Sequence, residues 1–268
     1  MPVESLLDIG QSIQETRTSM ERVQDVMKYA SDNSYVKTFS EDDITEFEKL
    51  KGTIELRHVT FGYSKLEEPL LKDFEAVKNF NMEIKDKEFI IFVGPSGCGK
   101  STIAKLISGL YEPWEGEILY DGKKITEIPR ESFSGSLSVV DQEITLFEDS
   151  ISENIKMWDK SITDYEVILA SRDAQIYQDI MARPGGYEHK IDAGGRNFSG
   201  GQRQRFEIAR VLAGDPTIVI LDEATSALDA KTEYEVTKAI KNRGITTIVV
   251  AHRLSTIRDC NEIIVLEH

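Results

Sequence analysis

Cysteine and long hydrophobic runs are scarce in this sequence of 268 residues, basic residues are outnumbered by acidic ones, and each of these features excludes a class of protein. With only Cys98 and Cys260, the chain cannot build a disulfide framework, and a reducing cytoplasm is favoured. No apolar run reaches about 18 residues, so the chain as given does not span a membrane. The 32 Lys and Arg residues face 47 Asp and Glu residues, and the resulting net charge of −15 argues against a nucleic-acid partner, which needs a basic face.

The chain does contain enough apolar material for one domain with a sizeable core. Hydrophobic residues make up 40% of the sequence. Short, continuous apolar runs at 88–93, 217–221 and 247–251 predict buried strands of a parallel sheet. We therefore expect an α/β fold in which helices separate these strands.

A glycine-rich loop lies between the first of these runs and a segment with helical spacing. Glycines let backbone N–H groups approach phosphates without a Cβ clash, and the start of the helix adds partial positive charge. Lys100 would reach the β- and γ-phosphates of ATP, and Ser101 would give its hydroxyl to Mg²⁺. A glycine-rich turn that matches by chance is the alternative. The predicted ATP-binding residues are Gly94, Pro95, Ser96, Gly97, Cys98, Gly99, Lys100, Ser101 and Thr102.

Two acidic residues, Asp222 and Glu223, follow the apolar run at 217–221, which would place them at the edge of the sheet beside the phosphate loop. Asp222 is the candidate Mg²⁺ ligand, and Glu223 is the candidate general base that polarises an attacking water. A solvated strand end is the alternative. The run at 247–251 would bring His252 to the same edge, where it could contact the γ-phosphate, although a lone histidine at a strand end is more often structural.

A second glycine motif precedes a segment with the apolar spacing of a helix, and its first residue is a typical N-cap. The start of that helix would present N–H groups and the positive end of the helix dipole to an anion. The anion has to come from outside the segment. The residues of this motif are Ser199, Gly200, Gly201 and Gln202.

In this order the motifs resemble the nucleotide-binding domain of ABC transporters, from about Gly52 to the C-terminus. The resemblance implies an α/β fold: a P-loop NTPase core with a parallel sheet, an antiparallel β subdomain and a helical subdomain that carries the signature motif. Antiparallel strands are expected at 53–63, 80–84 and 116–121, and the helical subdomain at 144–212. The implied activity is ATP hydrolysis, with ATP and Mg²⁺ as cofactors.

Three further positions take roles from this resemblance. Tyr63 matches the aromatic residue that stacks on adenine, and Gln142 matches the glutamine that contacts Mg²⁺ and the attacking water. Asp229 belongs to the segment 226–229, which matches a loop that crosses a dimer interface. Seen singly, these residues are explained as well by a core aromatic, a surface amide and a helix N-cap.

The resemblance also implies a homodimer. ATP on the phosphate loop of one copy would be covered by the Ser199 helix start of the second copy, and hydrolysis would release the two copies. Two departures from the family pattern concern other contacts. Phe198 replaces the usual leucine, and Ala193 stands where many exporters have a glutamate that contacts the membrane domain, so that contact is in doubt.

The sequence predicts three segments. Residues 1–30 carry a narrow apolar seam at helical spacing, which is expected to continue from a transmembrane domain of the same polypeptide or, alternatively, to form a surface helix. Residues 31–52 are expected to be an acidic linker. Residues 53–268 would be the ATP-binding domain, truncated at its C-terminus, where residues 266–268 are either native or a tag remnant.

The signature region most resembles that of peptidase-containing bacterial exporters of bacteriocin-like peptides. This implies a peptide cargo for the full transporter and a place at the cytoplasmic face of the bacterial plasma membrane. The alternatives are an ATPase subunit of an ABC importer, which would begin near Thr53, and a non-transport ABC ATPase that acts on nucleic acid, which would need a basic face.

Overall fold

The computed structural model describes residues 13–24, 27, 48–63, 77–141, 144–250 and 260–266. The chain separates into two compact units, Met1–Thr38 and Phe39–His268. In the first unit, residues 13–24 are helical, and their side chains are exposed, apolar Ile13, Met20 and Val23 among them. Within the described residues no helix combines the length and the apolar character that crossing a membrane requires.

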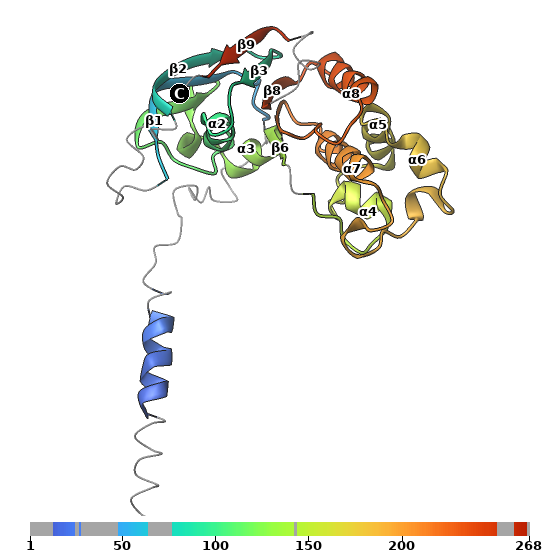
Figure 1. Cartoon of the computed structure of the whole chain (residues 1–268), viewed down its shortest axis with the longest axis horizontal. Helices are drawn as coiled ribbons and strands as arrows, with labels where there is room; N and C mark the ends of the chain where they lie inside the picture. Colours follow the sequence, from blue (N-terminus) through green and yellow to red (C-terminus); the bar gives the residue numbers. More distant parts are fainter. Residues whose placement is uncertain are drawn as a thin grey trace, which may run out of the picture. The chain divides into compact units, whose positions relative to one another are not determined.

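The second unit is built around a five-stranded parallel sheet (Figure 1). Each pair of neighbouring strands runs parallel. Parallel strands put their carboxyl ends at one edge, where the loops that follow them can form a binding site. The strands, in spatial order, are β6 (Leu137–Val140), β7 (Ile218–Asp222), β8 (Thr246–Val250), β3 (Phe89–Val93) and β9 (Glu262–Val265).

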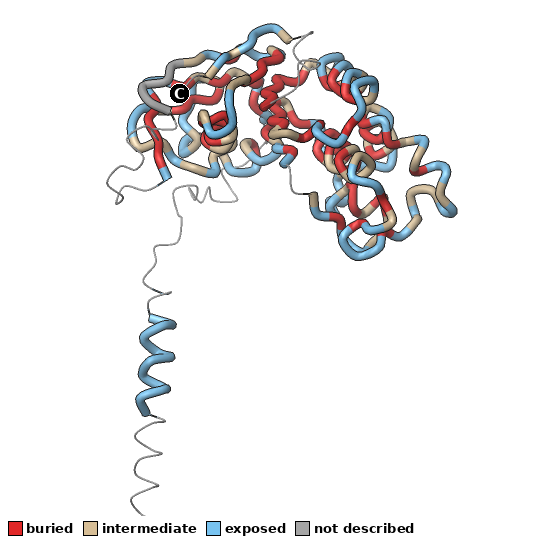
Figure 2. The backbone as a smooth tube through the Cα atoms, viewed as in Figure 1, coloured by how far each residue is buried: buried red, intermediate tan, exposed pale blue. Residues whose placement is uncertain are grey.

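The apolar runs of the central strands are continuous because both faces of the sheet are covered. On β3, Phe89 and Ile91 belong to the core shared with the helical part, whereas Ile90 and Phe92 belong to the core shared with β1 (Ile54–Phe61). Figure 2 shows these strands as the buried centre of the domain. Burial of each such side chain contributes about 1.5–3 kcal/mol.

A four-stranded antiparallel sheet forms the second layer, in the order β2 (Val77–Ile84), β1, β4 (Glu115–Tyr120) and β5 (Lys123–Lys124). Asp121 and Gly122 turn β4 into β5 with left-handed φ angles of 49° and 78°. The Asp121 carboxylate also accepts N–H bonds from three successive residues that enter β1, at distances of 2.6, 3.2 and 2.9 Å. The donors are the backbone amides of Lys51, Gly52 and Thr53.

The helices divide into two groups. α2 and α3 pack into the core that the parallel sheet shares with β1, whereas α4 to α8 gather on the far side of the parallel sheet from β1 (Figure 1). α7 packs against both α4 and α5 and is therefore the central helix of its group. The helices are α2 (Lys100–Ile107), α3 (Arg130–Ser136), α4 (Ile151–Lys156), α5 (Asp164–Asp173), α6 (Tyr177–Met181), α7 (Gly200–Ala213) and α8 (Ala230–Asn242), with 3₁₀ turns at Ile125–Glu127, Gly186–Glu188 and Ala193–Gly195.

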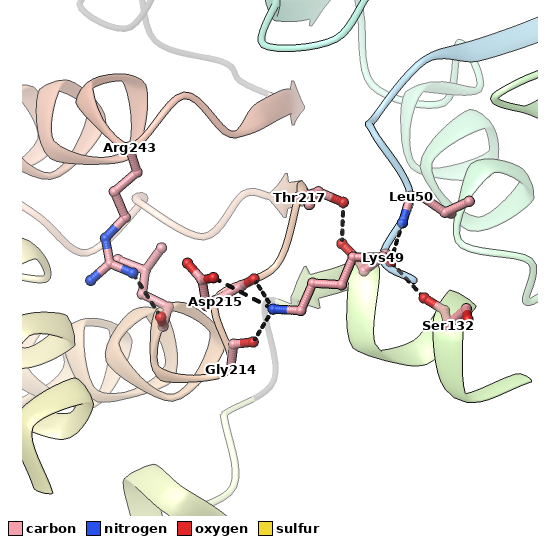
Figure 3. A network of polar contacts seen from close by, with 9 residues as sticks. Lys49, Leu50, Ser132, Gly214, Asp215, Thr217 and Arg243 are labelled. Atoms are coloured by element: carbon pink, nitrogen blue, oxygen red, sulfur yellow. Dashed lines mark hydrogen bonds and ion pairs between the residues drawn. The ribbon is translucent and has the colours of Figure 1, made fainter. Parts of the chain in front are cut away.

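The residues that lead into β1 are bound to the domain by polar contacts (Figure 3). Lys49 Nζ donates to the Asp215 carbonyl oxygen at 2.8 Å, just beyond the end of α7. One residue later, the Leu50 N–H donates to Ser136 Oγ at 2.8 Å, at the end of α3. A cation beside the carbonyls that end a helix is favourable, because those carbonyls carry the negative end of the helix dipole. The last residues of the predicted linker therefore touch both groups of helices.

The predicted architecture of a parallel core, an antiparallel β part and a helical part is confirmed. The expected antiparallel strands correspond to β1, β2 and β4, and the expected parallel strands to β3, β7 and β8. Two short strands of the parallel sheet, β6 and β9, were not predicted. Both are edge strands of only four residues, and the apolar run of β6 is interrupted by Ser138.

Candidate functional site

The glycine-rich loop joins β3 to α2, as the sequence predicts. Gly94 has a φ of 155°, and a β-carbon there would lie only 2.4 Å from the Leu266 carbonyl oxygen, so only glycine fits. Gly99 has a left-handed φ of 93° and is the N-cap of α2. The loop therefore aims the start of a helix, with its N–H groups, at the edge of the parallel sheet.

The Lys100 side chain lies across this loop. Its ammonium group donates to the carbonyl oxygens of Gly94 at 3.0 Å and Pro95 at 2.8 Å, and it lies 3.7 Å from Cys98 Sγ. The residue is only 5% exposed. A buried ammonium group that lies across a glycine-rich loop is arranged to receive an anion such as a phosphate.

Ser101 and Asp222 meet at the mouth of the site. Ser101 Oγ donates to Asp222 Oδ1 at 3.0 Å, which joins α2 to the end of β7. Burial raises the pKa of the Asp222 carboxyl, the Ser101 hydrogen bond opposes that rise, and the charges of Asp141 and Glu223 add to it. Asp222 also lines a cavity of about 480 Å³ with Asp141 and Lys105.

This pair fits a hard divalent cation. A hydroxyl and a carboxylate oxygen are ligands that Mg²⁺ accepts, and Mg²⁺ usually takes its other ligands from water and from phosphates. A cation here would also offset the negative charge that disfavours ionisation of Asp222. Among the residues that the structure describes, no group of three or more His, Cys, Asp or Glu side chains is placed to hold a metal ion.

Glu223 follows Asp222 in a strained backbone conformation. Its φ is 53°, which is uncommon for a residue with a side chain. The conformation is held by the Glu223 N–H, which donates to the Val250 carbonyl oxygen at the end of β8 at 3.1 Å. Strain of this kind is concentrated at functional sites, because the surrounding structure must maintain it.

The second glycine motif begins α7. Ser199 Oγ accepts a bond from the Gln202 N–H at 3.2 Å, and Gln202 Oε1 accepts one from the Ser199 N–H at 3.0 Å, so the two residues form a capping box. Gln202 Nε2 also donates to Asp179 Oδ1 on α6 at 2.8 Å. Ser199 and Gly200 are exposed. The start of α7 is therefore fixed in direction and open to a ligand.

The two glycine motifs belong to different parts of the domain. The phosphate loop opens α2, which lies between the two sheets, whereas the signature motif opens α7 within the helical group (Figure 1). The two predicted anion-binding helix starts therefore belong to separate groups of elements.

Tyr63 lies at the end of the described part that contains β1 and is 53% exposed. Its hydroxyl shares a hydrogen bond of 2.8 Å with Thr102 Oγ1 of α2. Its ring packs edge-on against Phe61 and Tyr111, with ring centroids 5.4 and 5.7 Å apart. An exposed aromatic ring tied to the phosphate-loop helix is placed to contact a nucleotide base.

The structure describes one of the three remaining predicted site residues, Asp229, and does not describe the other two. Asp229 caps α8, because its carboxylate accepts bonds from the Lys231 and Thr232 N–H groups at 3.1 and 3.0 Å. The side-chain hydrogen bond from Thr232 is the main cause that lowers the pKa of Asp229. Gln142 and His252 lie outside the described residues. The structure thus joins the loop, Asp222 and Tyr63 through contacts with α2, and it leaves the roles of Gln142, His252 and Asp229 as predictions.

Gln204 is a residue of the site region that sequence reasoning missed. It lies on the buried face of α7, four residues before Ile208, and is 4% exposed. A glutamine on the apolar side of a helix was the available signal, since buried polar groups need partners. Its amide contacts the loop that contains Glu223.

Comparison with known proteins agrees with this geometry. The sequence model of the ABC transporter family matches residues 77–226 of this chain. A bacterial Atm1-family ABC exporter, solved with ATP bound, superposes on this chain with a TM-score of 0.80 at 33% sequence identity. The match covers 95% of this chain and 43% of the exporter chain. The chain therefore belongs to the ABC transporter family and is its ATPase domain.

Three curated relatives are named as an ABC transporter, an ABC multidrug transporter and a lipid A-core flippase. An ATP-dependent lipid A-core flippase of Syntrophus aciditrophicus is 36% identical over 267 residues, or 99% of this chain and 42% of that protein. ABC transporter B family member 2 of Dictyostelium discoideum is 40% identical over 237 residues, or 88% of this chain and 17% of that protein. An ABC multidrug transporter of Trichophyton rubrum is 42% identical over 217 residues, or 80% of this chain and 16% of that protein. The chain thus spans less than half the length of each of these relatives.

Proposed function

We propose that this chain is the ATP-hydrolysing, nucleotide-binding part of an ABC exporter, and that two copies close on ATP to drive transport. The observation that carries the proposal is the assembly at the edge of the parallel sheet. The buried Lys100 ammonium, the Ser101 hydroxyl and the Asp222 carboxylate converge there from α2 and β7. Glu223 is the next residue along the chain.

The roles of the site follow from this assembly. Lys100 would exchange its two carbonyl acceptors for the β- and γ-phosphate oxygens of ATP, and the glycine N–H groups would hold the remaining oxygens. Ser101 and Asp222 would hold Mg²⁺, with Gln142 as a further ligand. Bound Mg²⁺ would neutralise charge on the phosphates. Tyr63 would stack on the adenine ring.

Glu223 would then act as the general base. Its position directly after Asp222 would place its carboxylate near the γ-phosphate, where it accepts a proton from the attacking water. The strained backbone at Glu223 supports this role, because the fold maintains an unfavourable φ at that one position of the loop. His252 would contact the γ-phosphate and orient the water.

The second copy of the chain would complete the site. The start of α7 at Ser199 and Gly200 is exposed and is fixed in direction by the capping box, and it belongs to the helical group, whereas the phosphate loop opens α2. A γ-phosphate on the loop of a partner copy would give these N–H groups an anion, and Asp229 would lie at the same interface. ATP would therefore hold the homodimer closed, and hydrolysis would release it.

The transport role rests on the relatives and on the first unit of the chain. The relatives include a lipid A-core flippase, an ABC multidrug transporter and an Atm1-family ABC exporter by name. The helix at 13–24 exposes Ile13, Met20 and Val23, which fits a segment that needs a partner such as a transmembrane domain of the same polypeptide. The domain would then work at the cytoplasmic face of a bacterial plasma membrane. Peptide cargo of the bacteriocin type stays a proposal from the signature sequence alone.

Magnesium-dependent ATP hydrolysis by wild type and Glu223→Gln tests the enzymatic core of this proposal. Loss of a general base should lower kcat by about 100-fold or more, while ATP binding persists because Lys100 and the loop are unchanged. Glu83→Gln, an exposed position in β2, is the matched control and should keep wild-type turnover. Equal turnover in wild type and Glu223→Gln would refute the assignment of the base.

A further inference from the structure

Gln204 connects the signature helix to the loop that carries Glu223. Its Nε2 donates to Ser226 Oγ at 3.1 Å and to the Glu223 carbonyl oxygen at 3.5 Å, and its Oε1 accepts a bond from the Ala227 N–H at 2.9 Å. The side chain is almost wholly buried. Its donor and acceptor are therefore both used, and all three bonds go to one loop.

The loop from Glu223 to Asp229 is itself a folded unit. The Ser226 N–H donates to the Glu223 carbonyl oxygen at 3.1 Å, and the Leu228 N–H donates to the Thr225 carbonyl oxygen at 3.0 Å. Thr225 Oγ1 donates to the buried Glu233 carboxylate of α8 at 2.8 Å. A displacement at Ser226 or Ala227 is therefore passed on to Glu223 rather than absorbed within the loop.

The start of α7 presses on the same loop. A β-carbon at Gly201 would lie 3.0 Å from the Ala227 carbonyl oxygen, and one at Gly200 would lie 3.9 Å from Ala227 Cβ. The signature glycines thus leave little room for a side chain beside Ala227, whose N–H is held by Gln204. The position of the loop is therefore set by α7 as well as by β7 and α8, the elements that the loop joins.

We propose that Gln204 is a positioning residue that holds the loop of Glu223 to the signature helix and thereby couples the two ATP sites of the dimer. This inference rests on the proposed function. In that dimer the start of α7 binds the ATP of the partner, whereas Glu223 serves the ATP on its own chain. A shift of α7 when phosphate binds at one site would move Glu223 at the other, and such coupling is reciprocal.

The test is Gln204→Met in the 268-residue chain, because methionine has a similar length but removes all three hydrogen bonds. Gln178→Met, at an exposed position on α6, is the matched control. For each variant we would measure the Kd of a fluorescent ATP analogue, kcat, the Hill coefficient for ATP and the melting temperature. We expect Gln204→Met to lose about tenfold or more in kcat, with a Hill coefficient near one and an unchanged Kd, since misplaced catalytic groups cost rate rather than ground-state binding.

Ser226→Ala keeps the proposal testable if Gln204→Met does not fold, because Ser226 is exposed and its hydroxyl accepts the 3.1 Å bond. When both variants fold, the double variant should be no slower than the slower single variant, since both changes remove one shared bond. Multiplied losses would contradict the proposal. Wild-type kcat and Hill coefficient in Gln204→Met, or a loss that follows the loss of ATP binding, would overturn it.

Failure of this inference differs from failure of the proposed function. If the chain is not an ATPase of the proposed kind, wild type shows no turnover or Glu223→Gln equals wild type. If only the coupling is wrong, Glu223→Gln is inactive while Gln204→Met behaves like Gln178→Met.

Discussion

Alanine substitutions at the two signature glycines should have different effects on stability. Both residues lie in the first turn of α7, where replacing glycine by alanine removes chain entropy from the unfolded state and stabilises a helix by about 0.5–1 kcal/mol. At Gly200 the new β-carbon meets Ala227 Cβ at an ordinary 3.9 Å. At Gly201 it meets the Ala227 carbonyl oxygen at 3.0 Å, a contact that forces the loop or the helix to move.

The expected magnitudes follow from these distances. Overpacking costs about 1–3 kcal/mol, which cancels or exceeds the helical gain at Gly201 but does not apply at Gly200. Gly200→Ala should therefore be more stable than Gly201→Ala by at least about 1 kcal/mol, which corresponds to about 2–4 °C in Tm for a domain of this size.

Urea unfolding followed by circular dichroism, with ATP omitted, measures the difference. Because both variants add the same methyl group to the same helical turn, the comparison isolates the contact with Ala227. Equal midpoints for the two variants, or a more stable Gly201→Ala, would refute the idea that α7 presses on the loop.

Two other changes follow from the electrostatics of the described residues. Burial raises the pKa of Asp222 in the folded state, so the folded chain holds this proton more tightly than the unfolded chain, and stability should fall as pH rises from the ordinary aspartate pKa through the raised one. Without Mg²⁺, Asp222→Asn should thus be more stable than wild type at neutral pH and should lose that advantage below the ordinary pKa; a constant difference across a pH series of urea unfolding curves would contradict this. Asp121→Ala removes the carboxylate that accepts three backbone N–H bonds and places alanine at a φ of 49°. It should therefore lower the free energy of unfolding by about 2–4 kcal/mol in the same assay. An unchanged midpoint would show that Asp121 does not anchor the residues before β1.

The phosphate loop and the acidic strand end could be predicted because their signals are local. The apolar run, the glycines and the helical spacing lie next to each other in the sequence, and so do the apolar strand and Asp222. The edge strands β6 and β9 are harder to predict: both have only four residues, and Val139 and Val265 are 38% and 63% exposed. Short edge strands are covered on fewer sides, so their composition does not need to be apolar throughout.

Contacts between distant residues could not be predicted from local spacing. Gln204 reaches Ser226 across 22 residues, and Lys49 reaches Asp215 across 166 residues. Both contacts depend on where α7 lies relative to other elements. The sequence shows that Gln204 falls on an apolar face, but only the folded chain shows which loop satisfies its amide.

The central claim is that ATP binds between the phosphate loop of one copy and the Ser199 helix start of another. Light scattering on the Glu223→Gln chain at high protein concentration, with and without Mg²⁺ and ATP, tests it most directly. We predict a monomer without ATP, a dimer with ATP, and a monomer under both conditions when Ser199→Arg is added. A chain that stays monomeric at saturating ATP, or a dimer that Ser199→Arg leaves intact, would contradict the account.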